Sequence, residues 1–120
     1  MLDRISLDAK FAQFDEPWSP RIVGELNGQL VKVVRMRGAF DWHHHDHEDE
    51  LFLVHRGGFR MEFRDRAVEL VAGDMIIVPR GVEHRPVADA EAEVVLFEPA
   101  TTLNTGNVRT ARTVERPARI

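Results

Sequence analysis

Apolar and polar residues alternate along several short stretches of this chain. Residues 59–64 are Phe-Arg-Met-Glu-Phe-Arg, so in a strand the three apolar side chains would share one face and the charged side chains the other. Turn-forming pairs such as Gly57-Gly58 and Gly73-Asp74 separate stretches of this kind. Many short strands with close-set turns predict an all-β sandwich or barrel. We expect strands at residues 21–26, 29–37, 50–55, 58–64, 67–71, 75–78 and 93–98.

The first two of these strands form the clearest local pattern, a hairpin. Asn27-Gly28 lies between them, and this dipeptide supplies the two positive φ angles of a type I′ turn. Val31, Val33 and Val34 favour extended backbone in the second strand. Because a sandwich has strand edges that attract pairing, we expect this hairpin to contact a second subunit, and we predict a homodimer.

The segment before the hairpin has a helical spacing instead. Leu7, Phe11 and Phe14 recur at i, i+4 and i+7, which places them on one helix face. Ser6 precedes them and can cap the helix, and prolines follow shortly after. We predict that residues 1–20 form an arm or short helix that docks onto the body of the protein.

The length and the turn formers near the C-terminus define the domain organisation. A chain of 120 residues has the usual size of one domain with a single core. Residues 101–107 are rich in turn formers, and the last twelve residues contain four arginines and one glutamate. We therefore predict a β-barrel domain at residues 21–99 and an irregular tail at residues 100–120, packed along the domain or onto a second subunit.

Composition excludes several kinds of chemistry. The sequence has neither cysteine nor tyrosine, so disulfides, thiolate ligands and phenol groups are excluded. The net charge is −4 and there is no basic stripe, so we do not expect nucleic acid as a partner. The N-terminus lacks the pattern of a signal peptide and no apolar run is long enough for a bilayer. The expected location is therefore the cytoplasm, with no membrane association.

Histidines gather in one short stretch. Five of the six lie in residues 42–57, together with four acidic residues. In a strand, His43 and His45 would point to the same side about 6 to 7 Å apart at the backbone. Glu50 lies far enough beyond them for the chain to reverse and bring its carboxylate alongside, and His84 follows a compact turn after a buried strand. These four residues can converge on one metal ion.

A second register of the histidines is open on spacing alone. His45 and His47 form another His-x-His pair on one face. In the register with His43 and His45, His47 is a turn residue, while His44 and His55 are surface residues. The acids Asp46, Glu48 and Asp49 are interpreted as a solvated turn, and Glu83 and Arg85 as surface residues that form salt bridges.

Two groups of residues resemble the motifs of the cupin family. In the first, a glycine precedes His-x-His, a glutamate follows after three or four residues and a glycine after six more. The matching residues are Gly38, His43, His45, Glu50 and Gly57. The second matches at Gly73, Pro79, Gly81 and His84. Two departures exist: Gly38 is separated from His43 by four residues where the pattern has five, and Ala88 stands where the pattern has asparagine. The two motifs occur in the right order and at the right distance.

This resemblance implies both a fold and a site. The fold is a cupin-type double-stranded β-helix, or jelly-roll barrel. The site is one divalent transition metal, Fe, Mn, Ni or Zn, held by His43, His45, Glu50 and His84. The family pattern thus favours the register with His43 and His45 over the register with His45 and His47. Three nitrogens and one carboxylate leave coordination positions open for a small-molecule ligand or substrate. We expect a metalloenzyme of the dioxygenase or isomerase and lyase type; the alternative is a cupin that binds or senses a small molecule without catalysis.

Overall fold

The computed structural model describes residues 2–120 of the chain, and its architecture is all-β. One short helix, α1 (Leu7–Phe11), precedes seven strands. The order of the strands along the sequence agrees with the prediction from alternation. The strands are β1 (Arg21–Leu26), β2 (Gln29–Ala39), β3 (Glu50–Arg56), β4 (Gly58–Glu62), β5 (Ala67–Val71), β6 (Met75–Val78) and β7 (Arg85–Pro99).

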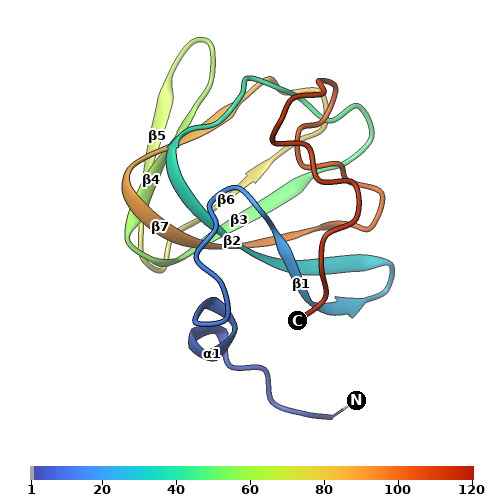
Figure 1. Cartoon of the computed structure of the whole chain (residues 1–120). Helices are drawn as coiled ribbons and strands as arrows, with labels where there is room; N and C mark the ends of the chain where they lie inside the picture. The colour runs from blue at the N-terminus through green and yellow to red at the C-terminus, as the bar shows by residue number, and fades with distance from the viewer. Residues whose placement is uncertain (1) are drawn as a thin grey trace.

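The longest strand, β7, joins the two parts of the barrel. Neighbouring strands pair in the order β1-β2-β7-β3-β6, while β4 pairs with β5 and β7, and every pairing is antiparallel. The first residues of β7 lie beside β4, and its later residues lie between β2 and β3. In Figure 1, β7 curves around the molecule from β4 and β5 toward β2 and β3. The predicted cupin-type β-barrel is confirmed.

Several strand bounds differ from the prediction: β4 ends at Glu62 rather than at residue 64, and β3 and β7 each end one residue later than predicted. The last strand begins at Arg85 rather than at residue 93, because pairing with β2 and β4 extends a stretch that contains Pro86 and several alanines, which favour strands weakly. The second strand continues to Ala39 with an irregular register next to Gly38, whose φ of 80° fits a bulge. In the hairpin turn, Asn27 and Gly28 have φ angles of 51° and 77°, as a type I′ turn requires.

Alternate residues of the strands fill the interior of the barrel. On β4, Phe59 and Met61 are buried, while Phe63 lies beyond the end of the strand and is half-buried. Burial of one large apolar side chain contributes about 1.5 to 3 kcal/mol, so this interior is the main source of stability. The buried members of the interior cluster are Trp18, Val34, Met36, Phe40, Phe52, Val54, Phe59, Met61, Leu70, Val78, Ala88, Ala92, Val94 and Leu96.

The helix docks on the outside of the sheet, as its spacing predicts. The Ser6 side chain accepts a hydrogen bond from the Ala9 N–H at 3.2 Å and caps α1. Phe11 is buried and packs with Val33 and Val95 in a separate small core. Figure 1 shows α1 beneath the sheet, with the N-terminal residues extending away from the body. Within residues 2–120, no helix has the length and apolar character to cross a membrane.

The C-terminal segment packs back along the same domain. Its end runs beside β1, where Ile22 pairs with Arg119 in a bridge and the Ile120 N–H donates to the Ile22 carbonyl at 3.0 Å. The strand β2 is itself paired on both sides, by β1 and β7. On β1, the C-terminal segment contacts the backbone of Ile22, and among the strands of residues 2–120 β1 pairs with β2 alone. The expected contact of the hairpin with a second subunit stays a prediction.

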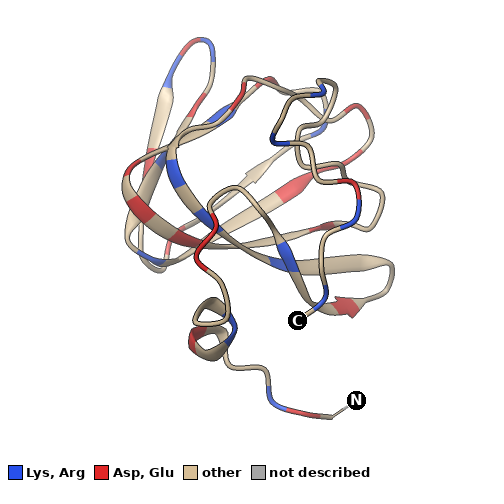
Figure 2. Ribbon diagram, viewed as in Figure 1, with Lys and Arg blue, Asp and Glu red and all other residues tan. Residues whose placement is uncertain are grey.

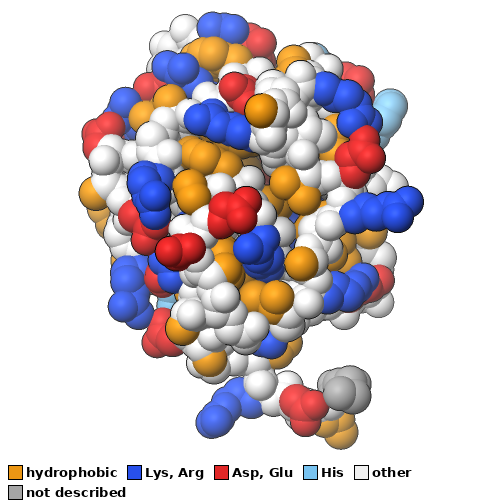
Figure 3. Space-filling view, in the orientation of Figure 1, with side chains coloured by type: hydrophobic (Ala, Val, Ile, Leu, Met, Phe, Trp, Pro, Cys, Tyr) orange, Lys and Arg blue, Asp and Glu red, His pale blue; other side chains and the backbone are white. Residues whose placement is uncertain are grey.

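Charged residues of both signs are distributed along all parts of the fold. Figure 2 shows basic and acidic positions interspersed on the strands, the turns and the C-terminal segment. On the face seen in Figure 3, basic, acidic and apolar side chains are likewise mixed. The predicted surface salt bridges of Glu83 and Arg85 are present, to Arg64 and Glu62 respectively, each at 2.7 Å.

Candidate metal centre

A two-residue backbone bridge brings the two histidine motifs together. The His43 N–H donates to the His84 carbonyl at 3.1 Å, and the His84 N–H donates to the His43 carbonyl at 2.9 Å. Apart from this bridge, residues 40–49, all of which the structure describes, form no regular strand. The expectation that His43 and His45 lie on a strand is therefore wrong. The extended backbone still alternates: His43 and His45 are buried, while His44 is half-exposed.

Glu50 begins β3 and faces the three buried histidines. Its Oε1 atom lies 2.8 Å from His45 Nε2 and 3.3 Å from His84 Nε2. The rings of His43 and His84 have centroids 4.4 Å apart. One nitrogen or oxygen atom from each of the four residues lies within 4.8 Å of the others. The four side chains predicted from the sequence are therefore gathered in one place, with ligand atoms close enough to hold a single metal ion.

Hydrogen bonds to backbone carbonyls fix the orientation and tautomer of two of these rings. His43 Nδ1–H donates to the Asp41 carbonyl, and His84 Nδ1–H donates to the Val82 carbonyl, each at 2.8 Å. A carbonyl oxygen can only accept, so in the neutral ring Nδ1 holds the proton and Nε2 has a free lone pair. Metal-binding histidines are commonly fixed in this way.

A bound metal ion would explain why polar atoms lie buried at the centre of the group without hydrogen-bond partners. Within the described part of the chain, His45 Nε2, His84 Nε2 and Glu50 Oε1 are buried and have no partner with hydrogen-bond geometry, although they lie close together. Each buried polar atom left without a partner costs about 1 to 3 kcal/mol. Lone pairs and a carboxylate oxygen that face one another are favourable when a cation lies between them. The residues therefore fit a bound divalent metal.

Burial and mutual contact change the protonation of this group. Burial and the neighbouring His84 together lower the pKa of His43 to about 4, although the hydrogen bond to the Asp41 carbonyl opposes the shift. His43 is therefore neutral at physiological pH, as a metal ligand must be. Burial would raise the pKa of Glu50, but its contacts with His45 and His84 outweigh this and hold the pKa below its usual value. Glu50 is a carboxylate near neutral pH.

The other residues of the histidine-rich stretch lie outside this group. His47 is exposed in a bend, so the structure gathers His43 and His45 rather than His45 and His47. His44 Nε2 lies 2.9 Å from Asp46. His55 is half-buried, because it stacks on Phe11 of α1 and lies 2.7 Å from Asp8.

The predicted acidic turn is partly organised by contacts. Asp49 accepts hydrogen bonds from the backbone and side chain of Arg80 at 2.8 and 3.2 Å. Glu48 accepts a hydrogen bond from the Thr101 hydroxyl at 2.9 Å. These acids link the turn to neighbouring segments and do not join the group around Glu50.

A second grouping of acidic residues and histidine, Asp8, His55 and Glu93, has a different explanation. Arg56 Nη2 lies 2.8 Å from Asp8, and Arg35 Nη1 lies 3.1 Å from Glu93. Two arginine cations already neutralise these carboxylates. We interpret this grouping as an ion-pair network that joins α1 to the sheet.

Two residues of the C-terminal segment contact residues 43–45, which we call the histidine loop. Neither residue was predicted from the sequence to have this role. Asn107 forms a pair of hydrogen bonds with His44: its Oδ1 accepts from the His44 N–H at 2.8 Å, and its N–H donates to the His44 carbonyl at 3.0 Å. Gly106 lies against the same carbonyl, so closely that a Cβ atom there would be 2.2 Å from it. The only sequence signal was the local richness in turn formers.

A buried ion pair next to Glu50 was also missed. Lys32 Nζ lies 3.5 Å from Glu98 Oε2, and the two side chains are 2% and 1% exposed. Burial raises the pKa of Glu98, and the nearby Glu50 raises it further while Lys32 opposes the shift. The sequence signal was available, because Glu98 continues the alternation of the inward-facing residues Val94 and Leu96 on β7.

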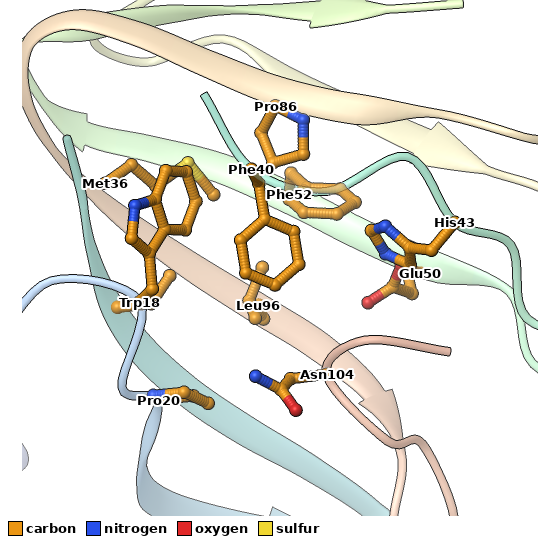
Figure 4. Close-up of a pocket in the computed structure, with 11 residues that line it drawn as sticks. Trp18, Pro20, Met36, Phe40, His43, Glu50, Phe52, Pro86, Leu96 and Asn104 are labelled. Atoms are coloured by element: carbon orange, nitrogen blue, oxygen red, sulfur yellow. The ribbon is translucent and has the colours of Figure 1, made fainter. Parts of the chain in front are cut away.

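A mainly apolar cavity opens next to the group. His43 and Glu50 lie at one end of the cavity and Trp18 at the other, with Phe40 and Phe52 between them (Figure 4). The edge of the Phe40 ring faces the His43 ring at a centroid distance of 5.4 Å. A ligand in this cavity would therefore meet the candidate metal centre directly. The lining residues are Trp18, Pro20, Val34, Met36, Phe40, His43, Glu50, Phe52, Pro86, Leu96 and Asn104.

Comparison with known proteins agrees with this fold and this arrangement. The family model Cupin_2, described as a cupin domain, matches residues 31–99, which include all four residues of the candidate centre. The chain belongs to the Cupin_2 family. In this cupin, Trp18 and Asn104 of the cavity lie outside the matched segment.

Relatives of this cupin include solved structures. It is 41% identical to a cupin-2 domain containing protein from Shewanella frigidimarina NCIMB 400, with a TM-score of 0.78 over 79% of this chain and 93% of the other. Protein NMB1881 from Neisseria meningitidis is 28% identical, with a TM-score of 0.74 over 82% and 100% of the two chains. The protein YdbB of Bacillus subtilis (strain 168), itself termed uncharacterized, is 32% identical over 63% of this chain and 77% of its own.

Proposed function

We propose that His43, His45, Glu50 and His84 bind one divalent transition metal, Fe, Mn, Ni or Zn, and that this cupin is a metalloenzyme acting on a small oxygen-bearing molecule. The observation that carries the proposal is the set of buried atoms at the centre of the group that lack hydrogen-bond partners within residues 2–120. Nitrogen and carboxylate ligands of this kind suit each of these metals.

The protein residues have distinct roles in this proposal. When bound, the ion would offer open positions in which substrate oxygens or dioxygen are polarised or activated. The carbonyls of Asp41 and Val82 hold the His43 and His84 rings with Nε2 free, and the Glu50 carboxylate reduces the net charge of the ion. Phe40 and Phe52 exclude water from the substrate side of the site.

The lining of the cavity favours one type of reaction over others. Isomerases and lyases need a protein group that moves a proton to or from the substrate. Among the described residues that line the cavity, the titratable ones are His43 and Glu50, and both are assigned to the metal. We therefore favour oxidation of the substrate by dioxygen over an isomerase or lyase reaction, because in such an oxidation the metal supplies the main chemistry.

The apolar lining also supports a second candidate function. A cupin that binds or senses a small molecule needs shape and a metal contact but no further acid or base. The cavity, with its predominance of aromatic and aliphatic side chains, meets that requirement as well. Turnover, rather than binding, distinguishes the two candidates.

Metal analysis tests the site. The full chain is purified without metal-affinity steps, and its metal content is measured by mass spectrometry for the wild type and for His43→Ala and His84→Ala. We expect the wild type to retain close to one equivalent of metal and both variants to lose most of it. His44→Ala and His47→Ala are the matched controls, since both side chains lie outside the group, and they should keep the metal. Undiminished metal in both His43→Ala and His84→Ala would refute the site.

Oxygen consumption then tests the reaction. The Fe, Mn, Ni and Zn forms are each mixed with small catechols, diketones and sugar acids under an oxygen electrode. We expect at least one metal form to consume oxygen with a catechol or diketone, and not with a sugar acid. Binding of these compounds without oxygen uptake or any other turnover would favour the non-catalytic candidate.

A further inference from the structure

The cavity next to the candidate centre is closed by segments outside the part of the chain that matches the cupin family. Trp18 and Pro20 come from the segment before β1, and Asn104 comes from the segment after β7, whereas the family match covers residues 31–99. Figure 4 shows Trp18 and Pro20 at the end of the cavity away from His43 and Glu50, with Asn104 at its lower side. Part of the cavity wall is thus built by segments that the family match does not include.

Trp18 is held rigidly as the end wall. Its backbone has a φ of 59°, a left-handed conformation that is uncommon for a large side chain. The Trp18 N–H donates to the Arg35 carbonyl at 2.8 Å and the ring Nε1–H donates to the Arg37 carbonyl at 2.9 Å, while the ring packs on Phe40 at 4.7 Å. A strained backbone of this kind costs about 1 to 3 kcal/mol and is found most often where a residue must be positioned for function.

The polarity of the walls restricts the chemistry of the ligand. The one uncharged polar side chain in the lining, Asn104, already uses both ends of its amide: Nδ2 donates to the Arg112 carbonyl and Oδ1 accepts from the Val114 N–H, each at 2.8 Å. Within the described chain, neither lysine nor arginine lines the cavity. Hydroxyl groups of a sugar, or a phosphate, would therefore be buried there with few partners, at a cost of about 1 to 3 kcal/mol for each group.

The size of the cavity restricts the ligand further. The space open to the centres of water-sized molecules is about 40 Å³, which is enough for roughly three waters. That volume corresponds to one compact ring or a short branched chain. Trp18, Phe40 and Phe52 offer ring faces and edges against which an aromatic group can pack.

We propose that the ligand of this cavity is a small, uncharged, mainly apolar molecule with one aromatic ring or an equally compact group, and that Trp18 determines this specificity. The oxygen atoms of the ligand point to the candidate centre and its apolar part lies between Phe40 and Trp18. This inference rests on the proposed metal site, because the metal is what holds the oxygen atoms.

Two hydroxamates with the same metal-binding group test the proposal. Benzohydroxamate carries a phenyl ring and acetohydroxamate a methyl group, so a difference in affinity reports on the apolar cavity. By calorimetry on the metal-loaded full chain, we expect benzohydroxamate to bind at least tenfold more tightly. In Trp18→Ala this preference should fall severalfold, and the bulkier 2-naphthohydroxamate should bind more tightly than it does to the wild type. Trp42→Ala is the matched control, since Trp42 lies outside the lining and stacks on Arg64, and it should keep the preference.

The outcomes separate this inference from the proposed function. Equal affinities for the two hydroxamates in a protein that holds its metal would overturn the ligand class and leave the metal site standing. Failure to hold metal would overturn both. An unchanged preference in Trp18→Ala, with metal content and thermal unfolding like those of the wild type, would overturn the role of Trp18.

Discussion

Replacing Gly106 by alanine tests how the C-terminal segment supports the candidate metal centre. A Cβ atom at Gly106 would lie 2.2 Å from the His44 carbonyl oxygen and 3.1 Å from Cδ2 of His43. An ordinary contact begins near 3.4 Å, so the backbone of residue 106 and the histidine loop must separate by roughly 1.2 Å, the difference between 3.4 and 2.2 Å. The φ of residue 106, 57°, adds strain for any residue with a Cβ.

The size of the effect follows from the contacts that this separation breaks. The two hydrogen bonds between Asn107 and His44, at 2.8 and 3.0 Å, would be lost, at about 1 kcal/mol each. Left-handed backbone costs alanine about 1 to 2 kcal/mol more. We therefore expect Gly106→Ala to lower the free energy of unfolding by about 3 to 4 kcal/mol. Because His43 moves with the loop, metal affinity should fall about 10- to 100-fold.

Gly73 provides a matched control for the backbone strain. Its φ is 92°, and within residues 2–120 nothing lies within 4 Å of a Cβ built there. Gly73→Ala should cost only the strain, about 1 to 2 kcal/mol, and should leave metal affinity unchanged. Urea unfolding of the metal-free proteins gives the stabilities, and titration with metal gives the affinities. If the two variants lose equal stability and bind metal equally well, the C-terminal segment does not support the site.

Three further predictions concern charged and titratable groups. Glu50→Gln keeps the shape of the side chain but removes its charge, so metal content should fall at least tenfold, whereas Glu48→Gln should keep it; elemental analysis decides. The pKa of His43 is near 4 in the folded protein and ordinarily near 6.5, so the unfolded chain takes up the proton first as pH falls. Metal-free protein should therefore lose about 3 kcal/mol of stability between pH 6.5 and 4, a loss that is smaller in His43→Asn; an equal loss in both would contradict the assignment. Glu98→Leu leaves the buried Lys32 cation without its partner and should cost about 3 to 5 kcal/mol, most of which the double variant Lys32→Met/Glu98→Leu should restore in urea unfolding.

Local patterns along the chain were sufficient to predict most of the strands and the composition of the candidate centre. The alternation around Phe59 and Met61 depends on a period of two, which holds in any strand whatever packs against it. The Asn27-Gly28 turn depends on backbone angles that these two residues tolerate. The spacing of His43, His45 and Glu50 survives the absence of a regular strand, because extended backbone alternates even without a full ladder of hydrogen bonds.

Contacts between residues far apart in the sequence decided the rest. The early part of β7 is a strand because β2 and β4 lie on either side of it, and its own residues favour strands too weakly to show this. The positive φ of Trp18 and its place at the end of the cavity depend on carbonyls of β2. The approach of Gly106 to His44 requires the chain to return across the barrel.

The sequence by itself determined which side chains could bind a metal and on which kind of fold, since ligand type, spacing and strand period are local properties. Only the tertiary structure decided what surrounds them: the cavity that ends at Trp18, the hydrogen bonds from Asn107 that hold the histidine loop, and the ion pair of Lys32 and Glu98 next to Glu50. These features join segments that are distant along the chain, so their contacts exist only once the barrel has closed.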